Sequence, residues 1–283
     1  MKIGNDACKA RQLALRERST ALISSSNNLV RDGYSTALFS LNSTLWHRSE
    51  SCILKSLGYK IMAGTIKIVK SKTASIDVDP QKGFSELCPA ELPVEGALNI
   101  VEELLHNHQK ASVCLVSRDM HPSGALWEAS SPDEMLASVG LPEVDIKWNP
   151  HCIVGTLGCE LLPGLPSIRD YDFQINKGLD PDAHPYGAFY HDNAEKLSTG
   201  GIEFLRAKEI DTVIVGGLAL DFCVKKSVEQ LLDANFKVIV NLASTRAVIK
   251  QNSESVISEL SEKGAVFVEN AVEIQFTNAS VLD

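Results

Sequence analysis

The chain has 283 residues, 44% of them hydrophobic and 22% charged, which is enough for one large α/β domain or two small ones. Its formal net charge of -9 opposes binding to phosphate backbones, so the composition argues against nucleic acid and favours a small neutral substrate. No stretch approaches the roughly 20 apolar residues of a membrane-spanning helix, so we expect no membrane association.

The cysteines are scattered, odd in number and without a CxxC pair. They are Cys8, Cys52, Cys88, Cys114, Cys152, Cys159 and Cys223. This pattern argues against both a disulfide framework and a zinc finger. We therefore expect reduced thiols and a cytoplasmic protein.

The first sixty residues differ in composition from the rest. They carry a net charge of about +5, which leaves about -14 for the remainder, and they are Ser-rich without a sustained hydrophobic period. This predicts a disordered or weakly helical extension over residues 1–61 and a folded domain over residues 62–283. Two alternatives for the extension are an organelle transit peptide and an over-extended start, with translation beginning near Met62.

From Lys72 onward, apolar runs of strand length alternate with helical patterns. The predicted strands cover residues 74–78, 112–116, 172–175, 212–215, 237–240 and 265–268. Apolar residues spaced by three and four predict helices over 94–105, 224–232 and 253–263. This alternation predicts a three-layer α/β/α sandwich with a mostly parallel, doubly wound sheet. Residues 117–169 break the rhythm, and their histidines favour a functional loop.

Polar side chains follow four of the predicted strands. Asp79 follows the first, Asp119 and His121 the second, Lys177 the third and Cys223 the fourth. Ligands of open parallel sheets bind beyond the carboxyl ends of the strands, so we expect these residues to converge there.

Cys223 follows a Gly-containing turn and begins a predicted helix, where the unpaired N–H groups and the helix dipole lower the pKa of a thiol. This position favours a nucleophile, and the alternative is a small core hydrophobe. Asp79 and Lys177 can then accept the thiol proton and stabilise the anion. Their alternatives are a turn-forming Asp before Pro80 and a solvated loop lysine.

Asp119 and His121 are two residues apart at a strand end and project to the same side. His151 completes a set of two histidines and one carboxylate that can bind a metal ion and leave positions open. The alternatives are a turn at His121-Pro122 and a core histidine at 151. The remaining histidines are interpreted as structural, namely His47, His106, His108, His184 and His191.

Five motifs occur in order between Lys72 and Val248. They are VDPQKGF at 78–84, DMHP at 119–122, WNPHCIVGT at 148–156, KG at 177–178 with DP at 180–181 and YGAF at 186–189, and GLALDFCV at 217–224. The chain thus resembles the nicotinamidases, within the isochorismatase-like cysteine hydrolases. Aligned without a gap, the first motif indicates Asp79 rather than Asp77 as the catalytic acid.

The resemblance implies hydrolysis of nicotinamide to nicotinate and ammonia through a cysteine thioester, in NAD salvage. It implies Asp79, Lys177 and Cys223 as catalytic residues, with the backbone N–H groups of Ala219 and Cys223 binding the oxyanion. It also implies a cis peptide bond between Leu218 and Ala219.

The same resemblance implies one divalent metal ion, zinc first, with iron or manganese as alternatives. Its ligands are Asp119, His121 and His151, and the ion orients the pyridine ring between walls formed by Phe84, Trp148 and Tyr186. A small amide is the expected partner, and a homo-oligomer stays open as an alternative to a monomer.

The chain departs from the family pattern at several places. Ala125 and Trp127 stand where another histidine is usual, Gly83 replaces a second Asp, and His184-Pro185 replaces an Asp-Ser pair. Alternative functions are therefore a cysteine hydrolase acting on another amide or ureido group and a non-catalytic member of the fold. The metal motif favours nicotinamide over the former, and the intact catalytic residues argue against the latter.

Overall fold

The structure is a computed structural model that describes residues 65–277. The described residues all belong to one compact unit of the chain. The extension expected over residues 1–61 lies outside the described residues. None of the helices within residues 65–277 has the length and apolarity needed to cross a bilayer.

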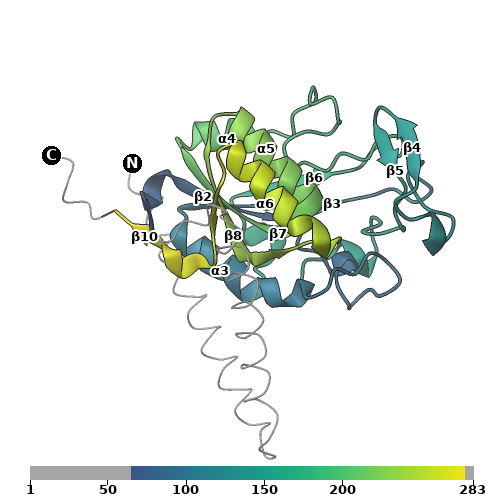
Figure 1. Ribbon diagram of the computed structural model, residues 1–283, viewed down its shortest axis with the longest axis horizontal. Helices are drawn as coiled ribbons and strands as arrows, with labels where there is room; N and C mark the ends of the chain where they lie inside the picture. Colours follow the sequence, from purple (N-terminus) through teal and green to yellow (C-terminus); the bar gives the residue numbers. More distant parts are fainter. Residues whose placement is uncertain (1–64, 278–283) are drawn as a thin grey trace, which may run out of the picture. The chain divides into compact units, whose positions relative to one another are not determined.

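Six parallel strands form the central sheet, in the order β6-β3-β2-β7-β8-β9 (Figure 1). They are β2 (Thr73–Val78), β3 (Val113–Asp119), β6 (Phe173–Lys177), β7 (Thr212–Leu218), β8 (Lys237–Arg246) and β9 (Val266–Val268). All six predicted strands are confirmed. From the central pair β2 and β7, the sheet continues through β3 to β6 on one side and through β8 to β9 on the other, so it is doubly wound.

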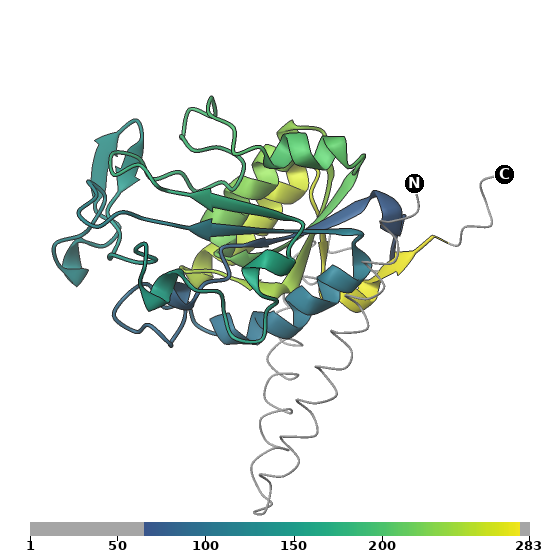
Figure 2. The same cartoon turned by 180° about the vertical axis from the view of Figure 1, so that it is seen from behind.

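Helices cover both faces of the sheet. Figure 1 shows α4 (Gly201–Ala207), α5 (Lys225–Asp233) and α6 (Ser253–Glu262) on one face, and Figure 2 shows α3 (Val101–Lys110) on the other. The predicted three-layer sandwich is confirmed. The first predicted helix begins later than expected, because Gly96 adopts a left-handed conformation and a 3-10 helix over Ala97–Ile100 precedes α3.

Two apolar cores lie on the two faces of the sheet. On one, Val228 of α5 and Ile257 of α6 pack with Ile76 of β2 and Val215 of β7. On the other, Leu104 of α3 belongs to a second buried cluster. Every residue of β2 and β7 is buried, because both faces of these central strands are covered.

Several short elements were not predicted. Strands β1 (Ile66–Ile68) and β10 (Ile274–Phe276) pair in parallel, and β4 (Ser138–Leu141) and β5 (Val144–Ile146) form an antiparallel hairpin. Short 3-10 helices also occur at Lys70–Lys72, Lys82–Phe84, Pro132–Glu134, Leu157–Cys159, Ile168–Asp170, Lys250–Asn252 and Ala271–Glu273. The hairpin and three of these seven 3-10 helices lie in or at the edge of residues 117–169, the region that breaks the strand and helix rhythm.

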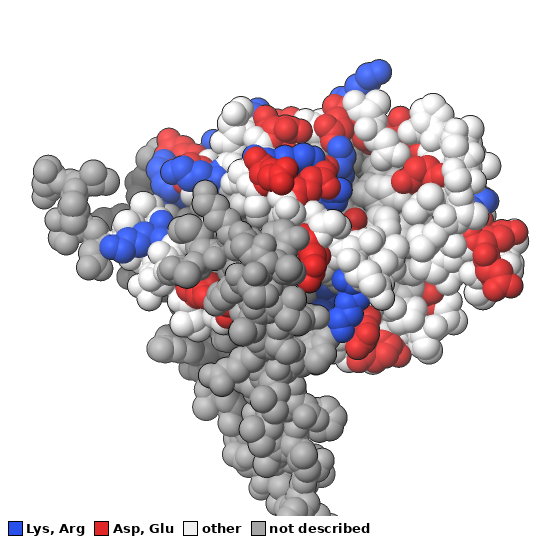
Figure 3. All heavy atoms as spheres, viewed as in Figure 1, with Lys and Arg blue, Asp and Glu red and all other residues white. Residues whose placement is uncertain are grey.

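Charged side chains of both signs alternate on the surface over α5 and α6. Lys225 pairs with Glu259 at 2.7 Å and Lys263 with Glu229 at 2.6 Å, linking the two helices. Figure 3 shows acidic and basic side chains beside one another on this face.

Candidate active site

Lys177 lies at the centre of the polar side chains that follow the strands. Its Nζ is 3.1 Å from Asp79 Oδ2 and 3.7 Å from Cys223 Sγ, and it also pairs closely with Asp119 Oδ1. All four residues are buried, so Lys177 is not a solvated loop lysine. The predicted convergence of acid, ammonium and thiol is therefore present.

The thiol of Cys223 does not have the lowered pKa that its sequence position suggested. Burial raises the pKa well above its usual value, and the nearby ammonium of Lys177 offsets this only in part. The resting group is thus a protonated thiol that needs a base. The expectation failed because the desolvation of a buried thiolate outweighs the helix dipole.

Asp79 lies in position to be that base. Burial raises its pKa to about 6, against the lowering effect of Lys177. Ser117 Oγ donates a hydrogen bond of 2.6 Å to Asp79 Oδ1, which favours the charged form. At neutral pH the carboxylate can accept a proton from the thiol.

Asp77, two residues earlier, points away from this group. Its Oδ2 accepts hydrogen bonds from Tyr171 Oη at 2.7 Å and from the His108 ring Nε2 at 2.8 Å. Side chains alternate along a strand, but the backbone turns after Val78, and Asp79 has a positive φ of 45°. The geometry thus agrees with the choice of Asp79 over Asp77.

The turn that carries Cys223 contains the expected cis peptide bond between Leu218 and Ala219. A π-helical turn over Leu220–Val224 follows and leads into α5. Asp221, in the same turn, accepts the backbone N–H groups of Val248 at 2.9 Å and Ile249 at 2.8 Å. These bonds tie the turn that carries Cys223 to the segment after β8.

Asp119 is held at the end of β3 by a residue to which the sequence assigned no role. The amide of Gln81 donates to the Asp119 carbonyl and accepts from the Asp119 N–H, both at 2.7 Å. Burial opposes the charge of Asp119, but Lys177 and His121 outweigh it and hold the pKa well below its usual value. The only signal for Gln81 was its place inside the first motif.

His121 and His151 come together as expected, with ring centroids 4.9 Å apart. The backbone explains this, since His121 N–H donates to Cys152 O at 3.1 Å and Val154 N–H to His121 O at 2.9 Å. The His121 ring Nε2 also lies 3.6 Å from Asp119 Oδ1. The three expected metal-ligating residues therefore share one buried site.

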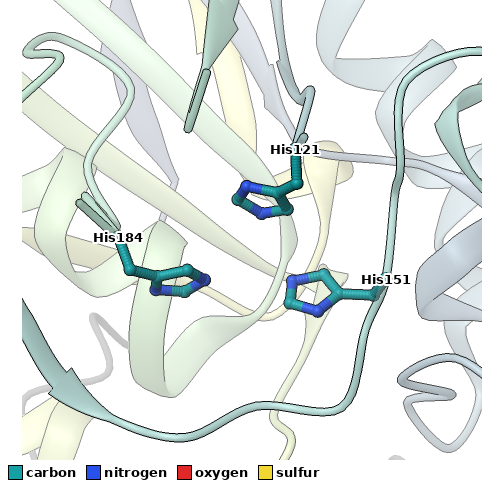
Figure 4. A group of neighbouring side chains, drawn as sticks. All are labelled: His121, His151 and His184. Carbon is teal, nitrogen blue, oxygen red and sulfur yellow. The ribbon is translucent and has the colours of Figure 1, made fainter. Parts of the chain in front are cut away.

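His184 joins this group, which corrects its interpretation as a structural histidine unrelated to the site. Ligand-capable nitrogens of His121, His151 and His184 all lie within 4.8 Å of one another, and Figure 4 shows the three rings turned toward a common space. The sequence lacked a signal for His184, because it follows no strand directly and its loop path depends on tertiary contacts.

Burial keeps the imidazoles of His151 and His184 neutral. It lowers the pKa of His151 to about 3, and it lowers the pKa of His184 well below its usual value, with His121 adding to the effect. Neutral imidazoles are the form that binds metal ions. The neutral rings of His151 and His184 therefore offer nitrogen lone pairs that fit a divalent cation.

A cavity opens onto Cys223. The residues that line it are Phe84, Leu92, Asp119, Trp148, His151, His184, Tyr186, Ala219, Phe222, Cys223 and Val248. The three expected wall residues are all present, and Trp148 Nε1 donates to Tyr186 Oη at 3.1 Å. Phe222 was not predicted, and its ring lies edge-on to Trp148 at 4.7 Å.

Two departures from the family pattern have local explanations. Gly83 fits a tight space, since an added Cβ would meet the Glu91 carboxylate and lie 2.8 Å from Cys152 Sγ. Trp127 is fully buried and packs against His121 with ring centroids 4.5 Å apart. At that position it is therefore a wall of the histidine cluster.

Comparisons with known proteins agree in family and fold. A family model described as the isochorismatase domain matches residues 73–271. The nicotinamidase of Escherichia coli strain K12 is 32% identical over 162 residues, covering 55% of this chain and 74% of that protein.

Two solved structures share the fold. PnC1 from L. infantum, in complex with nicotinate, has a TM-score of 0.64 and 23% identity, over 75% of this chain and 100% of that chain. The pyrazinamidase of Pyrococcus horikoshii, in complex with zinc, has a TM-score of 0.54 and 22% identity, and the match covers 70% of this chain and 98% of that chain.

Proposed function

Because this chain belongs to the isochorismatase domain family, we propose that it is a nicotinamidase, which hydrolyses nicotinamide to nicotinate and ammonia in NAD salvage. The observation that carries the proposal is the buried group of Asp79, Lys177 and Cys223 beneath a cavity with aromatic walls. The relatives named nicotinamidase support the choice of substrate. The free thiols of Cys88, Cys152, Cys159 and Cys223 suit a reducing compartment such as the cytoplasm.

Asp79 and Cys223 perform the first step. Asp79 takes the thiol proton, and Lys177, 3.7 Å from Sγ, stabilises the thiolate. The sulfur attacks the carboxamide carbon and forms a tetrahedral intermediate. Asp79 then passes the proton to the amide nitrogen, the C–N bond breaks, and ammonia leaves a thioester on Cys223.

Water completes the reaction. Asp79, again a carboxylate, takes a proton from the water that attacks the thioester carbonyl. The C–S bond breaks, nicotinate leaves, and the proton returns to the sulfur of Cys223. One amide and one water thus yield one acid and one ammonia, and the enzyme returns to its starting state.

The backbone N–H groups of Ala219 and Cys223 are the proposed oxyanion donors. Ala219 follows the cis bond and lines the cavity next to the thiol. Such donors act on charge that develops only in the transition state, and losing one typically costs about 2.7 to 4 kcal/mol.

Asp119, His121 and His151 are the proposed ligands of one divalent metal ion. The fit rests on His121 Nε2, which is buried and has no hydrogen-bond partner among the described residues. Imidazole and carboxylate ligands suit zinc first, with iron and manganese as alternatives. When bound, the ion supplies a Lewis acid for the pyridine nitrogen of the substrate.

Phe84, Trp148 and Tyr186 are the proposed walls for the pyridine ring. Phe84 lies against His151 with ring centroids 5.2 Å apart, and Trp148 lies against Tyr186 at 6.3 Å. Tyr186 Oη donates to Asp145 Oδ1 at 2.8 Å, which fixes the phenol. A flat aromatic substrate fits between such rings.

The test is ammonia release by the purified protein from nicotinamide, benzamide and an N-carbamoyl amino acid. We expect nicotinamide to be the best substrate, since benzamide lacks the ring nitrogen and the carbamoyl compound lacks the ring. Cys223→Ala abolishes turnover, whereas Cys88→Ala, outside the cavity, retains it. Preference for the carbamoyl compound would instead support a related cysteine hydrolase, and no turnover of any amide would contradict catalysis.

A further inference from the structure

Three buried imidazoles from three separate loops converge beside the proposed nucleophile. Ring centroids are 4.9 Å apart for His121 and His151, 5.2 Å for His121 and His184, and 5.9 Å for His151 and His184. The rings are turned toward one another (Figure 4). Such convergence in a protein interior calls for a partner that all three rings can share.

Two of the rings have a tautomer fixed by backbone carbonyls. His121 Nδ1 lies 2.9 Å from Gly178 O, and His151 Nδ1 lies 2.7 Å from Asn149 O. A carbonyl oxygen only accepts, so each Nδ1 must carry the proton and each Nε2 must present a lone pair. This is the arrangement in which outer hydrogen bonds orient metal-binding histidines.

His184 is held by its backbone and by packing. Its N–H donates to Glu143 O at 2.8 Å, in the turn of the β4–β5 hairpin, and its ring stacks on His121 with an interplanar angle of 19°. Within residues 65–277, neither ring nitrogen of His184 has a hydrogen-bond partner, although the side chain is only 3% exposed. Burying a polar group without a partner is unfavourable, and a cation bound at the acceptor nitrogen would offset part of that cost.

Among the described residues, the indoles that pack against His184 cannot satisfy both of its ring nitrogens. Trp127 and Trp148 lie against His184, with ring centroids 4.7 Å and 6.1 Å away. An indole has a donor but no acceptor, and a neutral imidazole needs one partner of each kind. Asp119 Oδ1 is already paired with Lys177.

We propose that His184 is a ligand of the metal ion, adding a third imidazole to those of His121 and His151. The inference rests on the metal ion of the proposed function and assigns it a residue that the strand-end pattern did not provide. Together with Asp119, the three imidazoles make four protein ligands, a set that suits a borderline cation such as Zn²⁺, and expansion to five-coordination keeps one position for substrate.

The test is the zinc dissociation constant, measured by competition with a chromophoric chelator for wild type, His184→Ala and His191→Ala. Loss of even an outer-shell partner weakens metal binding by about 10- to 100-fold, so we expect at least that loss for His184→Ala. His191 lies outside the cluster and serves as the matched control, with an unchanged constant. Thermal unfolding of the metal-free proteins, with His184→Gln as a second variant, checks that the fold persists.

X-ray absorption of the zinc-loaded proteins gives a second readout that does not depend on turnover. We expect one imidazole ligand fewer in His184→Ala than in wild type. An unchanged dissociation constant with an unchanged imidazole count overturns the role of His184, as does wild-type protein that binds no zinc. Ammonia release from nicotinamide by wild type is measured separately. A protein that releases ammonia but gives either of these results would overturn the role of His184 and keep the proposed function.

Discussion

Lys177 governs how charge moves among the buried residues of the site. It lies between Asp79 and Asp119, and both carboxylates outweigh the burial that opposes its charge and raise its pKa well above the usual value. Transfer of a proton from Cys223 to Asp79 moves a negative charge from oxygen to sulfur without changing the total. Because both positions are close to the same ammonium, this transfer avoids creating a new unpaired charge in the interior.

Ser117 should tune the acid side of the pH profile. Its hydroxyl bond to Asp79 Oδ1, at 2.6 Å, stabilises the carboxylate, so Ser117→Ala should raise the pKa of Asp79 above its present value of about 6. Activity requires the carboxylate and is lost as the pH falls through this pKa. The acid limb of kcat/KM should therefore move to higher pH in the variant, with a several-fold loss near pH 6.

Ser112→Ala is the control for that experiment. Its hydroxyl donates to Thr73 O, at the opposite end of the sheet, so its pH profile should match wild type. If the acid limb of kcat/KM does not move in Ser117→Ala, the limb does not report the ionisation of Asp79.

The sequence placed Asp79, Lys177 and Cys223 together because strand ends meet at one edge of a parallel sheet, a relation that depends on topology alone. It did not place His184, whose position depends on the hydrogen bond from its backbone to Glu143 in a hairpin that was not predicted. It was wrong about the pKa of Cys223, since the depth of burial of a helix start is a tertiary property.

The close approach of β2 and β7 shapes the edge of the sheet from which the site is built. Val78 is the register partner of Gly217, and a Cβ at Gly217 would clash with the Val78 backbone. Gly217 also has a φ of 120°, which L side chains rarely adopt. The glycine lets the strand pass next to the segment that carries Asp79.

Gly217→Ala should therefore destabilise the fold strongly. The matched control is Gly264→Ala, where φ is 110° but a Cβ meets nothing within 4 Å. Both variants pay a conformational cost of order 1–3 kcal/mol, and only Gly217→Ala adds the clash. Urea unfolding should give a clearly larger loss of unfolding free energy for Gly217→Ala than for Gly264→Ala. Equal losses would show that the close approach of β2 and β7 does not explain why residue 217 is a glycine.

At the scale of elements, the long apolar runs predicted the six central strands, and the three- and four-residue spacing predicted α3, α5 and α6. The remaining strands, β1, β4, β5 and β10, have only three or four residues, too few for a period to be recognised. Helix α4 has seven residues, and its burial of Ile202 and Leu205 depends on the sheet beneath it. These elements form through tertiary contacts rather than local pattern.

All of the proposed catalytic, metal-binding and wall residues follow Met62 in the sequence. We therefore expect a variant that starts at Met62 to keep kcat/KM for nicotinamide and its melting temperature close to those of the full chain. Ammonia release and thermal unfolding measure the two quantities. A large loss of kcat/KM would mean that residues 1–61 contribute to the site.

A second truncation, starting at Lys70, is the comparison. It removes β1, which pairs with β10, and with it the buried side chain of Ile68. Full burial of an isoleucine contributes about 1.5 to 3 kcal/mol, so this variant should melt at a clearly lower temperature. Equal melting temperatures for the two truncations would contradict a stabilising role for the β1–β10 pair.

The proposed mechanism depends on a covalent bond between Cys223 and the acyl group of the substrate. Rapid acid quenching during turnover of nicotinamide, followed by peptide mass spectrometry, tests it directly. We predict that the peptide carrying Cys223 gains one nicotinoyl group in place of the thiol hydrogen, and that Cys223→Ala shows neither adduct nor ammonia release. Continued turnover in Cys223→Ala, or an adduct on another cysteine, would contradict it.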